Sequence, residues 1–184
     1  MSHAYPPVRL YFRLTLLLLV GAAACSPKKN PEEKPRRPSP PATVTATTGN
    51  ATFVISYSRP SAKERKVFGG LVPYGQVWRT GANEATTFSV NQPVLVQGQP
   101  LPAGKYALFT IPGEKEWTVI FNQNATQWGA YEYDAAQDVL RVKARPEPAA
   151  RSVEQFLITA NQAGQVTLAW EDTQVRFAVR GASQ

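Results

Sequence analysis

Residues 105–122, KYALFTIPGEKEWTVIFN, decide the fold of this chain. Apolar residues dominate both 105–111 and 117–122, and the turn sequence PGEK lies between them. Two short apolar runs around a Pro-Gly turn predict a β-hairpin. Strands that are apolar on both faces are typical of the inner part of a sheet. We therefore expect a central hairpin that is covered on each side.

The chain around this hairpin alternates apolar and polar residues with period two, most clearly in 140–145, 166–170 and 175–180. Such alternation is typical of half-buried strands, and turn sequences separate the runs. The pattern predicts an all-β fold, an antiparallel β-sandwich (jelly-roll-like) of roughly ten short strands. The candidate strands are residues 52–58, 77–80, 85–90, 94–97, 105–111, 117–122, 129–133, 139–144, 152–159, 165–170 and 175–180.

The N-terminal segment has the pattern of a secretory signal peptide over residues 1–24. Arg9 and Arg13 precede the apolar run 14–20, which is too short to span a membrane. Small residues follow at 21–24, and then comes Cys25, the only cysteine of the chain. This ending resembles the lipobox of bacterial lipoproteins, which implies that Cys25 is diacylated and becomes the new N-terminus. The alternative is a stray thiol in a signal peptide that is cut elsewhere.

A Pro-, Lys- and Arg-rich tract follows, so we expect a disordered linker over residues 25–49 and a folded domain over 50–184. The formal net charge of the chain is +7 at pH 7. Most of this charge lies before residue 50, because the domain itself has thirteen basic and eleven acidic residues. A nearly balanced domain lacks the basic footprint of a nucleic-acid-binding protein. The expected partner is instead a membrane, reached through the N-terminal lipid.

Histidine and cysteine are absent from the expected mature domain, because His3 and Cys25 are the only ones in the chain. Their absence removes the common sites for zinc, copper and iron. It also removes Cys–His and Ser–His nucleophile pairs. We therefore expect no metal and no cofactor. Paired carboxylates are the one catalytic option left, and Glu84 with Glu132 or Asp134 is the candidate pair for glycoside processing.

The least regular stretch, residues 59–87, is dense in Gly, Pro, Arg and aromatics. This stretch and several later ones contain the segments RPS at 59–61, FGGLVPYG at 68–75, VWRTGANEAT at 77–86, LPAGKYALFTIP at 101–112, WTVIFN at 117–122 and QWGAY at 127–131. In these segments the chain resembles a bacterial lipoprotein family catalogued as domain of unknown function 2911. The resemblance implies a compact, mainly β module and supplies no reaction.

Two clusters are candidate ligand-binding sites. The first consists of Trp78, Arg79, Asn83 and Glu84 around Gly81, with Tyr74 as a second aromatic wall. An arginine beside a carboxylate can form a bidentate pair, and glycine at a bend allows close approach of a partner. Two roles are open: a buried Arg79–Glu84 pair that pins the loop, or a polar pocket for a hydroxylated or carboxylated ligand.

The second cluster consists of Trp128, Tyr131 and Tyr133, with amide side chains nearby. If residues 129–133 form a strand, period two places Tyr131 and Tyr133 on one face. Aromatic faces with nearby amides fit a carbohydrate-binding surface, whereas the alternative is ordinary aromatic packing.

These observations favour a lipid-anchored module of the bacterial cell envelope, either a binding domain or a structural one. A glycan and another envelope protein are the partners that fit this setting. The alternative function is a carbohydrate-active, glycoside-processing enzyme that uses paired carboxylates.

Overall fold

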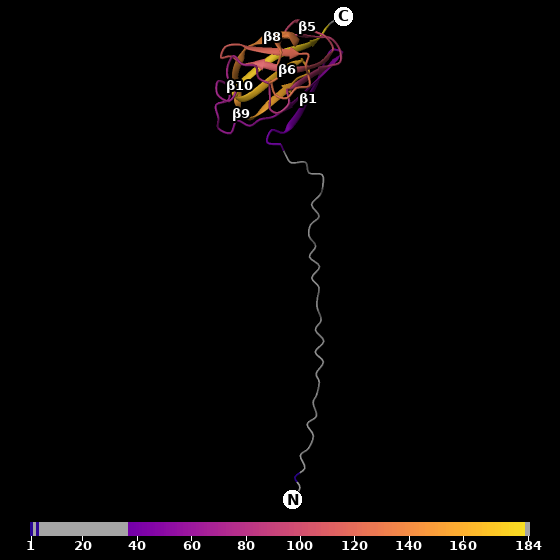
Figure 1. The fold of residues 1–184 in the computed structure, drawn as a ribbon. Coiled ribbons are helices and arrows are strands. Elements are labelled where there is room, and N and C mark those ends of the chain that lie inside the picture. Colours follow the sequence, from indigo (N-terminus) through magenta and orange to yellow (C-terminus); the bar gives the residue numbers. More distant parts are fainter. Residues whose placement is uncertain (2, 4–36, 183–184) are drawn as a thin grey trace. The chain divides into compact units, whose positions relative to one another are not determined.

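Ten strands and one short 3₁₀ helix make up the computed structural model, which describes residues 1, 3 and 37–182 (Figure 1). The strands are β1 (Pro41–Thr48), β2 (Ala51–Ser58), β3 (Thr87–Val90), β4 (Val94–Val96), β5 (Gln99–Leu101), β6 (Gly104–Ile111), β7 (Trp117–Asn122), β8 (Asp138–Ala144), β9 (Pro146–Ala160) and β10 (Gln165–Gly181). The 3₁₀ helix η1 (Ala135–Gln137) precedes β8. Cys25 and the candidate lipobox lie outside the described residues.

The strands form two sheets, one of six strands in the order β1-β2-β3-β6-β7-β8 and one of four in the order β5-β4-β10-β9. Every pair between named strands is antiparallel. In the larger sheet, β1 to β3 and β6 to β8 are two runs in which each strand pairs with the next in sequence. The predicted antiparallel β-sandwich is confirmed.

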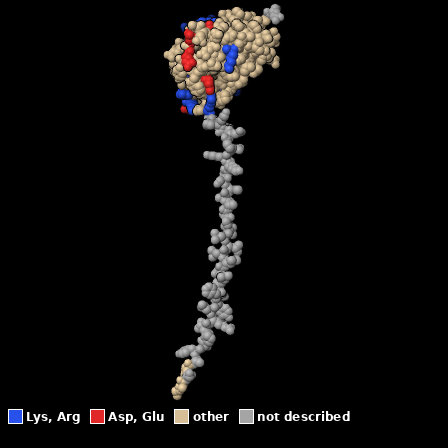
Figure 2. All heavy atoms as spheres, turned by 45° about the vertical axis from the view of Figure 1, so that its right-hand side comes forward, with Lys and Arg blue, Asp and Glu red and all other residues tan. Residues whose placement is uncertain are grey.

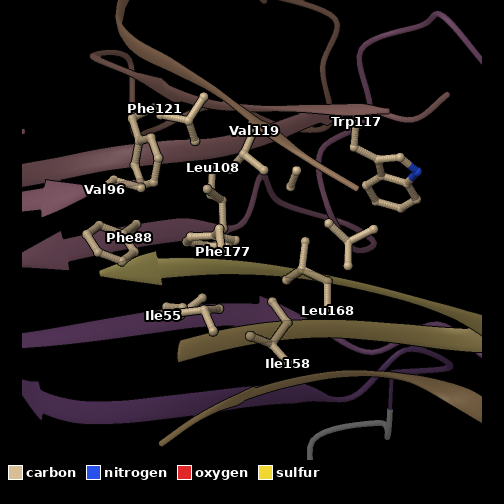
Figure 3. Close-up of a cluster of buried hydrophobic side chains, with 14 of the residues drawn as sticks. Ile55, Phe88, Val96, Leu108, Trp117, Val119, Phe121, Ile158, Leu168 and Phe177 are labelled. Atoms are coloured by element: carbon tan, nitrogen blue, oxygen red, sulfur yellow. The ribbon is translucent and has the colours of Figure 1, made fainter. Parts of the chain in front are cut away.

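The main hydrophobic core lies between the two sheets (Figure 3). Phe88, Leu108 and Phe121 come from the larger sheet, and Ile158 and Phe177 come from the smaller one. All five side chains are at most 1% exposed. Burying a side chain of this size contributes about 1.5–3 kcal/mol relative to leaving it in water. The apolar faces of the two sheets therefore pack against each other, as the period-two alternation of the strands predicts.

The hairpin of β6 and β7 occupies inner positions of the larger sheet, and both of its faces are covered. Leu108 and Phe121 contribute to the main core, whereas Phe109 and Ile120 on the opposite face belong to a second buried cluster. Two irregular segments cover that cluster. Val77 and Ala85 come from the segment between β2 and β3, and Ala130 and Tyr133 come from the segment between β7 and β8. The hairpin predicted from residues 105–122 is therefore confirmed.

The predicted boundary between linker and domain is wrong. Residues 41–48, predicted as linker, form β1 and pair along their whole length with β2. Val44 and its apolar neighbours Ala42 and Ala46 pack against the main core, while the exposed threonines between them face solvent. Threonine is a good strand former, and residues 42–47 alternate threonine with alanine or valine. The prediction missed this strand because the segment directly follows a proline-rich tract.

Two predicted strands, 77–80 and 129–133, are wrong. In the first, only Trp78 makes a bridge, to Thr110, and Thr80 has a φ of 54° that ends the extended conformation. The second begins at Gly129, whose φ of 67° starts a turn. The expectation that Tyr131 and Tyr133 share one face of a strand is therefore also wrong.

The two predicted strands 165–170 and 175–180 are parts of one strand, β10, in the structure. This strand folds back on itself near Glu171. The Val179 N–H donates to the Gly164 carbonyl at 2.8 Å. A straight strand rises about 3.3 Å per residue, so those two residues would otherwise lie roughly 50 Å apart. Glu171 has a φ of 52°, and the register with β9 shifts on both sides of it. The turn sequence at 171–173 thus bends the strand, as its composition predicts.

Within residues 1, 3 and 37–182, no helix has the length and apolar character needed to cross a membrane.

Candidate functional site

The irregular segment between β2 and β3 is attached to both sheets by backbone hydrogen bonds. On one side the Ala62 N–H donates to the Glu154 carbonyl, and the Phe156 N–H donates to the Pro60 carbonyl. On the other side Trp78 and Thr110 exchange two hydrogen bonds of 2.8 and 2.9 Å. The segment is therefore an ordered loop that crosses from β9 to β6.

A cluster of buried aromatic rings lies beneath this loop. The Trp78 ring stacks on Trp170 with the centroids 5.8 Å apart, and it meets Phe156 edge-on at 5.1 Å. Phe68, from the same loop, packs against Trp117 at 4.7 Å. The Trp78 indole N–H donates to the Gly81 carbonyl at 3.1 Å, which also closes the bend. The loop is thus anchored by apolar burial at its centre.

A pocket of ≈ 340 Å³ opens between this loop and the aromatic cluster. Trp78 and Trp170 contribute to its wall, and its other apolar residues include Leu71 and Val72. Its charged residues are two arginines, Arg65 and Arg79, and no acidic residue lines it. We call it the Arg79 pocket. Its full lining consists of Ser39, Pro60, Arg65, Leu71, Val72, Trp78, Arg79, Gly81, Ala82, Asn83 and Trp170.

Neither guanidinium of this pocket pairs with a carboxylate among the described residues. Arg65 is held by two backbone carbonyls, because its Nε donates to Ala62 at 2.8 Å and its Nη2 to Ser61 at 2.9 Å. The Nε of Arg79 is buried and has no hydrogen-bond partner in the part of the chain that is described. An unpaired buried donor of this kind costs about 1–3 kcal/mol, and more when it is charged.

Two of the six non-glycine residues with positive φ among the described residues lie close to Arg79. Thr80 and Asn83 adopt left-handed φ angles of 54° and 61°. For a β-branched residue such as Thr80 this conformation is an outlier. It is held by hydrogen bonds: the Thr86 hydroxyl donates to the Thr80 carbonyl at 2.7 Å, and the Thr80 hydroxyl lies 3.1 Å from that of Thr110. Strain of this kind clusters at ligand-binding sites.

Of the two roles left open for Arg79 and Glu84, the buried pair does not form. Glu84 is exposed and accepts two hydrogen bonds from Arg37, at 2.7 and 2.9 Å. Its own backbone N–H and the Arg37 guanidinium hold the pKa of the Glu84 carboxyl below its usual range. Arg79 and Asn83 line the Arg79 pocket, whereas Glu84 does not. Tyr74 is exposed and also lies outside that lining.

The second predicted cluster does not assemble as one aromatic surface. Trp128 and Tyr131 are 57% and 85% exposed. Tyr133 instead packs on Phe109 and donates a hydrogen bond to Asp138 at 2.6 Å. Burial, together with the hydrogen bond to Asp138, raises the pKa of Tyr133 to about 12. Tyr133 is therefore a structural residue, and Trp128 and Tyr131 are the exposed rings.

Two of the three carboxylates considered for glycoside processing, Glu84 and Asp134, have other roles, whereas Glu132 is exposed. Asp134 accepts the Ala136 N–H at 2.9 Å and caps η1. A general acid for this chemistry needs a raised pKa, whereas the pKa of Glu84 is lowered. Within the described residues, no group of His, Cys, Asp and Glu could hold a metal ion. Figure 2 shows acidic and basic side chains scattered among uncharged ones on the face that it presents.

The comparison with protein families places the whole sandwich in one group. A family model described as a protein of unknown function (DUF2911) matches residues 39–179. The chain belongs to this family. The match begins just before β1 and ends within β10, so the DUF2911 domain comprises all ten strands. No curated protein and no solved structure matches the chain.

Several residues of the DUF2911 domain's candidate sites were not predicted from the sequence. Arg65, Leu71 and Trp170 line the Arg79 pocket, and Arg37 pairs with Glu84. The one sequence signal for Arg65 is the basic run KERK at 63–66, which lies in the same irregular segment. Trp78, Arg79 and Asn83 were predicted together and do line one pocket.

Proposed function

We propose that this DUF2911 domain is a binding module of the bacterial cell envelope and that the Arg79 pocket binds the carboxylate of a small ligand. The observation that carries the proposal is the buried Nε of Arg79, which has no partner among the described residues, in a pocket with two arginines and no acid. An arginine and a carboxylate form charge-assisted, frequently bidentate hydrogen bonds. A carboxylate supplies the acceptor that this N–H lacks among the described residues.

The apolar lining indicates what the carboxylate is attached to. Leu71, Val72 and the two indoles of Trp78 and Trp170 contribute an apolar wall beside the arginines. Ligand sites in proteins commonly combine such a wall with a few polar groups that set orientation. A carboxylate on a flat or apolar body fits this combination better than a polyhydroxylated ligand.

The envelope location rests on the sequence of the N-terminal segment. Because two acyl chains anchor a protein stably, a diacylated Cys25 would hold the module at a membrane. We expect a clickable palmitate analogue to label the full-length chain in a bacterial host and to leave Cys25→Ser unlabelled. Equal labelling of the two chains would contradict the lipid anchor. It would have no bearing on the proposed ligand binding at the Arg79 pocket.

The pocket is tested with benzoate, which joins a carboxylate to a flat apolar ring, and with benzamide as its uncharged counterpart. We expect calorimetry on the full-length chain in detergent to show benzoate binding that exceeds benzamide binding. In Arg79→Gln the benzoate affinity should fall about 10- to 100-fold, because a hydrogen bond to a charged group contributes about 1.5–3 kcal/mol. Without ligand, Arg79→Gln should unfold at an equal or higher temperature, since it removes a charge that pairs with no carboxylate in the described part of the chain.

Two matched variants accompany this measurement. Arg180→Gln removes an exposed arginine from β10, outside the pocket, and should bind benzoate like the wild type. Glu84→Gln breaks an exposed ion pair, worth about 0–1 kcal/mol, so it should neither unfold the domain nor weaken benzoate binding. Equal binding of benzoate and benzamide, or undiminished affinity in Arg79→Gln, would refute the carboxylate site.

A further inference from the structure

The structure has a second hollow of ≈ 300 Å³. Some of its lining residues follow those of the Arg79 pocket directly in sequence, but the two linings share no residue. The second hollow is formed by residues 84, 85 and 87, before and at the start of β3, and by residues 125–128 of the β7–β8 connection. We call it the Trp128 hollow. Its lining residues are Glu84, Ala85, Thr87, Ala125, Thr126, Gln127 and Trp128.

The backbone around Trp128 is fixed although its ring is exposed. Glu84 and Trp128 form an isolated antiparallel bridge. The Gly129 N–H donates to the Asn83 carbonyl and the Ala85 N–H to the Gln127 carbonyl, both at 3.0 Å. The Trp128 side chain is 57% exposed, and its ring stacks on no other aromatic ring among the described residues. A large ring is thus presented to solvent on an ordered support.

Gln127 supplies an acceptor that no other described residue uses. The side chain is only 6% exposed, and its Nε2 donates to the Asn124 carbonyl at 2.8 Å. Because that carbonyl can only accept, the orientation of the amide is set and Oε1 points elsewhere. Oε1 is buried and has no partner in the described part of the chain. A ligand hydroxyl would provide the donor that this oxygen lacks.

The other polar groups of the hollow also favour a donor-rich, uncharged ligand. Glu84 is an acceptor whose lowered pKa keeps it ionised, and its charge is already matched by Arg37. Thr87 and Thr126 line the hollow and have hydroxyls that can accept or donate. No lysine or arginine lines it. An anion would meet Glu84, and a cation would have to compete with Arg37.

We propose that the Trp128 hollow binds one pyranose ring of a neutral glycan. The apolar face of the sugar stacks on Trp128, and a ring hydroxyl donates to Oε1 of Gln127. Aromatic rings contribute large, rigid contact area to recognition at low entropic cost. This site is independent of the Arg79 pocket, because the two share no lining residue.

The test is calorimetric titration of the full-length chain in detergent with three uncharged probes, cellotetraose, chitotetraose and maltotetraose. We expect saturable binding of at least one of them. With that probe, Trp128→Ala should lose affinity by about tenfold or more. Gln127→Met should also weaken binding, because it removes the unpaired acceptor at similar volume. Both variants are compared at equal folded fraction, checked by near-ultraviolet circular dichroism.

Tyr131→Ala is the matched control for an exposed ring, since Tyr131 is 85% exposed and does not line the hollow. It should bind the probe like the wild type. Binding of none of the three probes would overturn the proposal, as would binding that survives Trp128→Ala. Choline binding that depends on Trp128 and Glu84, in place of sugar binding, would show an ammonium site instead. Benzoate binding at the Arg79 pocket is unaffected by any of these outcomes.

Discussion

Trp170→Ala is expected to lower the free energy of unfolding by about 3–5 kcal/mol, the range for removing a large buried aromatic side chain. The Trp170 side chain is 1% exposed and contacts the rings of Phe68, Trp78 and Phe156. Its indole N–H donates to the Glu154 carbonyl at 3.2 Å. The cavity left by alanine would remove the packing that joins the loop to β9. Urea unfolding followed by circular dichroism measures the change.

Trp128→Ala is the control for this variant, because it removes the same chemical groups from an exposed position. Surface changes of this kind usually stay within about 0.5 kcal/mol. If the two variants unfolded at similar urea concentrations, the aromatic cluster would not be the anchor of the loop.

Gly164→Ala is expected to lower the free energy of unfolding by about 2–5 kcal/mol. Gly164 has a φ of 75°, and a Cβ placed there would lie 1.8 Å from the Val179 carbonyl oxygen. The left-handed conformation costs an L-residue about 1–2 kcal/mol. Relieving the overlap adds about 1–3 kcal/mol, because the Val179 backbone belongs to the returning arm of β10 and must move.

Gly98→Ala separates these two contributions. Gly98 has a similar φ of 80°, but a Cβ there would meet nothing within 4 Å. Its substitution should therefore cost only the conformational part, about 1–2 kcal/mol. Thermal and urea unfolding of both variants give the difference. Equal losses in the two would contradict the close approach of Gly164 to Val179, and with it the fold-back of β10.

The fold was predictable where neighbouring residues in the sequence determine the structure. The hairpin at 105–122 carries its own evidence, since both runs are apolar on both faces and the turn lies between them. β1 was missed because its threonines follow a proline-rich tract, and pairing with β2 decides its conformation. Strands at 77–80 and 129–133 were wrongly predicted because left-handed residues, Thr80 and Gly129, interrupt otherwise suitable sequences.

The site was predictable only in part for a related reason. Trp78, Arg79 and Asn83 are near neighbours in sequence, so one bend brings them to one pocket. Trp170 comes from a strand far along the chain, and its position depends on how the sheets stack. Arg79 was considered as a partner of Glu84 because opposite charges close in sequence can form a pair, whereas Glu84 pairs with Arg37. Asn83, in its left-handed conformation, lies between Arg79 and Glu84 in the sequence and turns the chain.

The central claim is that Arg79, whose Nε has no partner within residues 37–182, receives a ligand carboxylate. The most direct measurement is a crystal structure of the full-length chain soaked with 4-bromobenzoate, whose bromine is located by anomalous scattering. We expect the bromine against the apolar wall of the Arg79 pocket and the carboxylate in contact with the Arg79 guanidinium. A well-diffracting crystal with an empty pocket, or an Arg79 Nε bonded to a protein carbonyl, would contradict the account.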